Sequence, residues 1–329
     1  MIHSGKSITH FCFLVIIFFC ISAPAFGEIN VFGQSYCFTL SGGPGFLYGT
    51  SYEIVYRNSG SKEYLSELQW NFKPLFFLGL NLDFAQKNPK AAWGFFTGIG
   101  LKAGLTMETG FIEDRDWISP STVPSYLTHF SSHENHTKAA FLINLNSGFS
   151  FSIRNFIIKL LINFDYMYFK WEAWNGYLKY GAIIPGGYTP WNDPSGRSEP
   201  TYGLGISYVQ HWILVSAGIG ADFILNRFTL SANFLIGPSY CLAIDEHHKR
   251  NLQYTDYLNN GVSIKPKLGA FFSFSDRFDF GITAAYHYIW ETRGHTIEKL
   301  NGITIATRMD HAGARFQAIE GNIVVKYKL

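Results

Sequence analysis

Long stretches of this 329-residue chain alternate between apolar residues and small or polar residues with a period of two. In an extended strand, residues i and i+2 share a face, so the pattern predicts strands with one apolar and one polar face. Ten such runs can be marked. They cover roughly residues 35–56, 64–84, 92–116, 137–153, 156–172, 201–224, 228–247, 259–274, 278–292 and 313–329.

The run over residues 64–84 illustrates the prediction. Its larger apolar side chains are expected to face outward and its polar or small side chains to face the other way. The outward set is Trp70, Phe72, Phe76, Leu78, Leu80, Leu82 and Phe84, and the opposite set is Gln69, Asn71, Lys73, Gly79, Asn81 and Asp83.

Short and long connections alternate along the chain. Short turns on one side and long loops on the other are typical of outer-membrane barrels, whose long loops lie outside the cell. A soluble β-sandwich is the alternative, but it would leave an aromatic face on nearly every strand exposed or in need of a second sheet. The predicted long polar loops lie near residues 57–63, 117–136, 173–200, 248–258 and 293–312.

The composition agrees with a membrane barrel. Aromatic residues make up 18% of the chain, charged residues only 15%, and the formal net charge is +2. This near-neutral balance argues against a nucleic-acid partner. We therefore predict an all-β fold, a ten-stranded antiparallel transmembrane β-barrel with short periplasmic turns and long extracellular loops, as a single domain over residues 28–329.

The first 27 residues have the pattern of a secretory signal peptide. Lys6 gives a weak positive region, the segment from Phe11 to Ile21 is apolar, and small residues follow at 23–27. About ten apolar residues are too few to span a bilayer as a helix.

Two of the four cysteines, Cys12 and Cys20, fall within the predicted signal peptide. Cys37 and Cys241 remain in the predicted domain, both at positions expected to face inward. The sequence does not decide whether these two residues pair.

Two groups of ionisable residues follow long alternating runs. Asp114 and Asp116 end the third run, and Asp245 and His247 end the seventh, all on the inward parity. If the two strand ends meet across a barrel, three carboxylates and an imidazole converge near water. A histidine can accept a proton from water near neutral pH, and a neighbouring carboxylate can orient it. Two close aspartates repel each other, so one is expected to titrate high.

Three segments carry a resemblance to a known family. Asp-Arg-Asp-Trp at 114–117, Asp-Glu-His at 245–247 and Glu-Ile-Val-Tyr at 53–56 are similar to motifs of the omptin family of outer-membrane endopeptidases, over most of the predicted mature chain. The resemblance implies an aspartic-type (Asp-Asp/Asp-His) endopeptidase on the cell surface of a diderm bacterium. A water activated by these side chains would then attack the peptide carbonyl directly.

The resemblance also assigns residues. It implies that Asp114, Asp116, Asp245 and His247 are catalytic, and that Glu53 holds a basic substrate side chain. Omptins carry a second acid two residues before the catalytic aspartate of the second motif, and that position here is Ala243. Cleavage next to Arg or Lys is therefore only weakly implied, and a different preference stays open.

No cofactor is expected, and a lipid requirement is not evident in the sequence. The expected partners are extracellular peptide or protein substrates and outer-membrane lipid, and the chain is expected to act as a monomer. Three acids and a histidine are also compatible with a Ca²⁺ or Zn²⁺ site. Two other functions remain: a non-catalytic barrel that acts as an adhesin or surface antigen, and a porin, which a narrow ten-stranded lumen disfavours.

Overall fold

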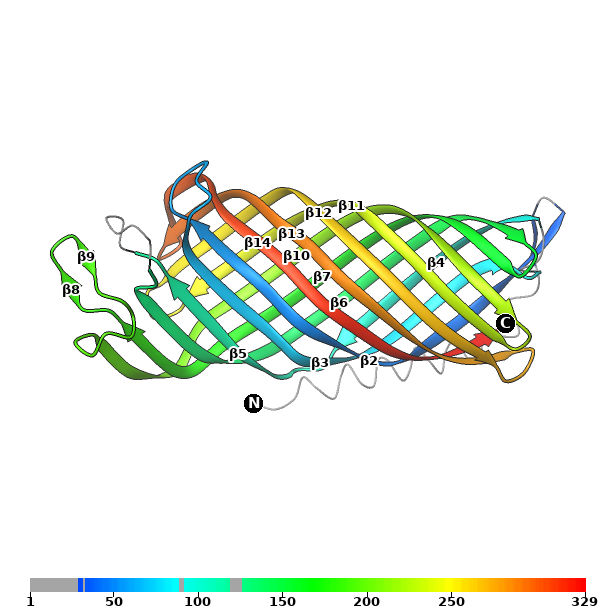
Figure 1. The fold of residues 1–329 in the computed structure, drawn as a ribbon, viewed down its shortest axis with the longest axis horizontal. Coiled ribbons are helices and arrows are strands. Elements are labelled where there is room, and N and C mark those ends of the chain that lie inside the picture. Colours follow the sequence, from blue (N-terminus) through cyan, green and yellow to red (C-terminus); the bar gives the residue numbers. More distant parts are fainter. Residues whose placement is uncertain (1–28, 32, 89–91, 119–125) are drawn as a thin grey trace.

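The computed structural model describes residues 29–31, 33–88, 92–118 and 126–329. These residues form an elongated β-barrel whose strands cross its long axis obliquely (Figure 1). The predicted signal peptide, residues 1–27, lies outside the described residues. Within them, no helix is long and apolar enough to cross a bilayer.

The described strands form one antiparallel ring with ten strand positions, as predicted. β2 pairs with β3 on one side and with β14 on the other. β4 and β5, one after the other, both pair with β3 and together occupy the third position of the ring. The short strand β1 extends along β2, and β8 and β9 form a small hairpin outside the ring. The strands are β1 (Ile29–Val31), β2 (Gln34–Tyr56), β3 (Tyr64–Gln86), β4 (Trp93–Gly104), β5 (Met107–Asp116), β6 (His129–Ile153), β7 (Phe156–Tyr180), β8 (Ile183–Ile184), β9 (Gly187–Tyr188), β10 (Arg197–Leu225), β11 (Phe228–His247), β12 (Leu252–Ser273), β13 (Phe278–Leu300) and β14 (Ile303–Lys328).

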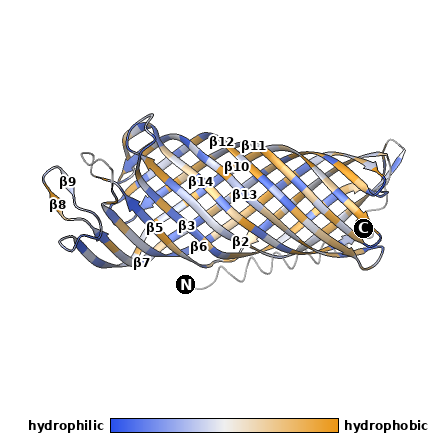
Figure 2. Cartoon of the chain, viewed as in Figure 1, coloured by the Kyte–Doolittle hydropathy of each residue, from blue (hydrophilic) through white to orange (hydrophobic). Residues whose placement is uncertain are grey.

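The outer surface carries an apolar band. Figure 2 shows hydrophobic residues concentrated toward the end of the barrel where the C-terminus lies, and hydrophilic residues toward the opposite end. On β11 the exposed apolar side chains run from Phe228 to Tyr240. At about 3.3 Å per residue and a tilt of about 45°, this span is about 28 Å tall, which matches the lipid-facing band of a membrane barrel. We call the end beyond Tyr240 the loop end and the opposite end the turn end.

Strands extend well beyond the apolar band at the loop end. β12 begins at Leu252 and β13 runs to Leu300, so most of the predicted loops 248–258 and 293–312 are hydrogen-bonded strand. The long polar loops predicted at these ranges are thus mostly paired strand, because the outward apolar alternation stops at the band whereas backbone pairing continues. The tip between β13 and β14 is an Asn301-Gly302 turn with φ of 50° and 80°, a strong hairpin signal.

The predicted facing of β3 was wrong for the residues before its register shift, Trp70 and Phe72 among them. Trp70 and Phe72 are fully buried inside the ring, whereas Phe76 points outward and is 46% exposed. The pairing of β2 with β3 shifts register between Leu47 and Gly49, where one residue of β2, Tyr48, lies opposite two of β3, Lys73 and Pro74. An extra residue of this kind reverses the parity of the side chains that follow.

Aromatic side chains fill the middle of the barrel. Trp70 stacks on Tyr208 with ring centroids 5.1 Å apart, and the Phe72 and Phe169 rings are 5.0 Å apart. These rings, together with Trp171, are fully buried. Such a layer occupies the lumen with side chains, as expected for a small barrel.

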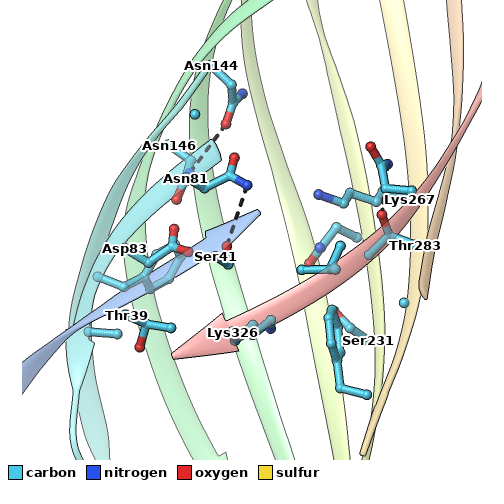
Figure 3. A pocket seen from close by; sticks show the side chains of 18 of the residues that line it. Thr39, Ser41, Asn81, Asp83, Asn144, Asn146, Ser231, Lys267, Thr283 and Lys326 are labelled. Carbon is cyan, nitrogen blue, oxygen red and sulfur yellow. Dashed lines mark hydrogen bonds between the residues drawn. The ribbon is translucent and has the colours of Figure 1, made fainter. Parts of the chain in front are cut away.

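A cavity of about 1290 Å³ lies inside the turn end. Polar and charged side chains line it, including Asp83, Lys267 and Lys326 (Figure 3). Cys37 also lines this cavity, whereas Cys241 is buried in the core, and no disulfide joins the two.

Candidate active site

The first acidic pair sits on β5 and faces the lumen as predicted. The path to it is not one regular strand, because a break separates β4 from β5 and the register with β6 shifts around Gly110, whose φ is 104°. Each irregularity changes the sequence parity: Thr109 and Ile112 are both fully buried, although one number is odd and the other even. The two changes cancel, so Asp114 and Asp116 return to the parity of the inward residues of β4.

The second pair is carried by β11, whose pairing with β10 continues without a shift from Leu214↔Ser239 to Ile206↔His247. Asp245 and His247 therefore keep the inward parity of Ala243, which is buried in the core. The Nε2 atom of His247 lies 2.7 Å from Oδ2 of Asp245. The aspartate is 3% exposed and the His247 side chain 22%, so the imidazole is reachable from the loop end and its carboxylate partner is covered.

Charge and burial act in opposite directions on His247. Burial lowers the pKa of the imidazole, but the charge and hydrogen bond of Asp245 outweigh it and leave the pKa raised above its ordinary value. Asp114 adds to this increase. The ring of Tyr254 meets the imidazole edge-on, with centroids 5.7 Å apart at 78°. These residues lie beyond the apolar band.

Burial raises the pKa values of both aspartates of β5. Burial and then the charge of Asp116 raise the pKa of Asp114 well above its ordinary value. Burial also raises the pKa of Asp116, and a hydrogen bond from Ser66 and the charge of Arg250 oppose that increase. The Ser66 hydroxyl donates to Oδ1 of Asp114 at 3.4 Å.

The two pairs are close enough to interact electrostatically. The charge of His247 lowers the pKa of Asp114, and that of Asp114 raises the pKa of His247. Among the hydrogen bonds of the described residues, none joins the two side chains directly. The structure thus brings together the four residues predicted to be catalytic, and their catalytic role stays a prediction.

Glu53 joins the same group from β2. Its side chain faces inward, is 4% exposed, and is paired in the strand register with Leu68 of β3 and Ala314 of β14. Burial raises the pKa of Glu53 well above its ordinary value, and the charges of Asp245 and Asp256 raise it further.

Asp256 of β12 is a site residue that the sequence analysis missed. It faces inward, is 5% exposed, and lies directly opposite Ala243 in the β11–β12 pairing. Burial, with a contribution from Asp245, raises the pKa of Asp256 to about 7. The residue was overlooked because it fell in a predicted loop, where strand parity was not considered. The alternation of Tyr254, Asp256 and Leu258 was the signal that could have found it.

Ser66 and Arg250 were missed as well. Ser66 follows a predicted strand start, and Arg250 lies in the turn that joins β11 to β12. Neither belongs to a motif, so only their spatial position relates them to Asp114 and Asp116. Within the described ranges, no group of three or more His, Cys, Asp or Glu side chains is arranged to hold a metal ion.

The fold and this cluster define an outer-membrane β-barrel protein with acids and one histidine gathered inside the loop end. The Omptin family matches residues 34–329, so the chain belongs to the omptin family. The family resemblance and the outer-membrane location predicted from the sequence are thereby confirmed.

Solved structures share the fold. The outer membrane protease OmpT from Escherichia coli matches with a TM-score of 0.79 and 18% identity, over 89% of this chain and 97% of that chain. The toluene transporter TodX from Pseudomonas putida matches with a TM-score of 0.29 and 9% identity, over 89% of each chain. A comparison with curated proteins found no match.

Proposed function

We propose that this protein is an endopeptidase of omptin type that hydrolyses peptide bonds of surface-accessible polypeptides, acting as a monomer. The observation that carries the proposal is the 2.7 Å contact between Nε2 of His247 and Oδ2 of Asp245. Asp114 and Asp116 interact electrostatically with the same imidazole. A base, a group that orients it and a nearby acid pair are the parts that general acid–base hydrolysis needs.

The orientation in the membrane follows from the connections. Membrane barrels place short turns in the periplasm and longer segments outside the cell. Two-residue turns at 154–155 and 226–227 lie at the turn end, while β6, β7 and β10 project far past the apolar band at the other. The proposed site therefore faces the extracellular side, where it meets polypeptides from outside the cell.

The chemistry proceeds through one water molecule. Because Nε2–H of His247 donates to Asp245, the Nδ1 atom is left as the proton acceptor. A water held between His247 and Asp114 loses a proton to Nδ1 as its oxygen attacks the peptide carbonyl carbon. Asp245 stabilises the imidazolium that forms.

Collapse of the tetrahedral intermediate then breaks the C–N bond. The leaving amine needs one proton, which comes from the imidazolium either directly or through Asp116, which takes up the imidazolium proton in turn. This route returns the site to its starting protonation state without forming an acyl-enzyme.

Cut-site mapping tests the proposal. Refolded protein is incubated with a diverse peptide library, and new termini are identified by mass spectrometry. Wild type and the His248→Ala variant, which removes a neighbouring imidazole, are expected to cut, whereas His247→Ala is expected not to cut. All three should keep the heat-modifiable migration of an intact barrel. Protein that binds host proteins and cuts nothing would instead be a non-catalytic adhesin or surface antigen.

A further inference from the structure

The polar cavity inside the turn end has no part in the function proposed above. The buried aromatic layer lies between this cavity and the titratable cluster of the loop end. The cavity lining reaches Asp276 and Arg277, which are exposed in the turn between β12 and β13. Its volume of about 1290 Å³ is large enough for a small organic molecule, since such molecules bind in pockets of roughly 300–1,000 Å³. A small molecule can therefore enter the barrel from the turn end.

Most lysines of the cavity wall are neutralised by carboxylates. An ammonium group inside a protein is stabilised when a carboxylate accepts its hydrogen bonds. Four such ion pairs line the cavity: Lys102–Glu320, Lys159–Asp222, Lys265–Asp165 and Lys328–Asp279. Within each pair the two charges cancel.

Two further lysines lack such a partner. Lys267 of β12 and Lys326 of β14 line the same cavity (Figure 3), and neither ammonium group forms an ion pair or a hydrogen bond with a described residue. The Lys326 ammonium lies 3.5 Å from the centroid of the Phe271 ring, and the Lys267 side chain is exposed to the cavity. Each ammonium group carries three N–H donors, which are available to an anion.

Among the described residues, one carboxylate near these two lysines has no lysine of its own. Asp83 interacts electrostatically with both Lys267 and Lys326. The other acids with a marked effect on the two lysines, Glu320, Asp222 and Asp279, belong to the four ion pairs. Two ammonium groups and one carboxylate leave one positive charge in excess at this level of the barrel.

Hydroxyl groups lie close to Lys267 on the same face of the sheet. In the strand register, Ser231 of β11 and Thr283 of β13 lie on either side of Gly269, two residues from Lys267. Figure 3 shows these side chains on the cavity wall together with Lys267. Glycine places no side chain between the two hydroxyls. Hydroxyl and ammonium groups both donate hydrogen bonds to oxyanions, and lysine is a common ligand of phosphate.

We propose that the turn-end cavity binds a phosphate group, free or carried by a small organic molecule, with Lys267 and Lys326 as its charged ligands. The two nearby hydroxyls add neutral donors. The side chains of Phe96 and Phe271 on the cavity wall offer an apolar surface to the rest of an organic ligand. Asp83 competes with the phosphate for the same lysines and so weakens its binding.

The binding of two probes, inorganic phosphate and glycerol 3-phosphate, tests the proposal without any use of cleavage. Each probe is titrated calorimetrically into refolded protein in detergent micelles, at an ionic strength of about 0.15 M that screens exposed charges. Saturable binding is expected, and glycerol, the neutral control, is expected not to bind. Tighter binding of inorganic phosphate identifies the free anion as the ligand, whereas tighter binding of glycerol 3-phosphate identifies an organic phosphate. Failure of both probes to bind, or equal binding of glycerol, overturns the proposal.

Variants then locate the site. Lys267→Met with Lys326→Met is expected to weaken binding by roughly 100-fold, because hydrogen bonds to charged groups are the stronger class. Lys62→Met, the same change at an exposed position of the loop end, is the matched control and should leave the affinity unchanged.

Asp83→Asn is expected to act in the opposite direction. It removes the competing carboxylate, so binding should tighten by roughly 5-fold, a gain that a damaged barrel could not produce. Heat-modifiable migration checks that each variant keeps an intact barrel. An unchanged affinity in the double lysine variant, or an Asp83→Asn variant that binds no tighter than wild type, overturns the assignment of these residues.

Discussion

At the scale of single residues, the site depends on how burial and charge act on each ionisable side chain. Burial alone would make His247 a weaker proton acceptor, and Asp245 reverses that effect through a direct contact. The same burial raises the pKa of Asp114, whose neighbour Asp116 adds repulsion. The strength of the base is therefore raised mainly by one carboxylate on its own strand, with a smaller contribution from Asp114.

This relation predicts a pH dependence. The raised pKa of His247 means that the imidazole becomes neutral only above its ordinary titration range, so kcat/KM should rise with pH through a limb above about 6.5. In Asp245→Asn, burial dominates and the limb should move to lower pH, while kcat falls by roughly 100-fold or more. Initial rates on one peptide across pH measure both effects.

Two results would count against it. A limb that stays in place in Asp245→Asn would mean that the carboxylate does not control the titrating base. A limb that moves to higher pH would have the wrong sign, because removing a negative charge cannot favour the imidazolium.

At the scale of elements, strand parity predicted the site and irregular strands limited the prediction. Alternation placed Asp245 and His247 correctly because the β10–β11 pairing is regular over that stretch. It placed Asp114 and Asp116 correctly although β5 carries two irregularities, because their effects cancel.

Strand parity gave wrong predictions where a strand carries a single register shift, and it gave none where a strand continues beyond the apolar band. A single register shift makes Trp70 face the barrel interior. The hydrophobic pattern could not reveal this change, because aromatic residues occupy both the interior and the outer face there. Asp256 was missed because strands past the apolar band have polar residues on both faces, so they resemble loops in sequence. A pattern that reports lipid contact cannot mark strand residues that no longer touch lipid.

At the scale of the whole molecule, the barrel has three levels along its axis. The titratable cluster lies at the loop end, the aromatic layer in the middle, and the polar cavity of about 1290 Å³ at the turn end. Because the layer is fully buried, the two polar regions are separated by packed rings. This arrangement argues against the porin alternative.

Conductance across a planar bilayer checks this separation. Wild type is expected to show no steady ion current. Trp171→Gly combined with Phe316→Gly, whose ring stacks on Phe169 with centroids 5.7 Å apart, opens the aromatic layer and should show discrete conductance steps. The control is Trp290→Gly, which removes an outward ring that is 42% exposed and should stay silent. A steady current through wild type would favour a pore.

The central claim is that the tips of β5 and β11 act on one water molecule. A double-mutant cycle on peptide cleavage tests it most directly, with barrel integrity checked by heat-modifiable migration. Asp114→Ala and His247→Ala are each expected to lower kcat/KM by roughly 1,000-fold, and the double variant should be about as slow as the slower single variant, since residues that act as a unit are not additive. Losses that multiply in the double variant, or cleavage that persists in both single variants, would contradict the shared site.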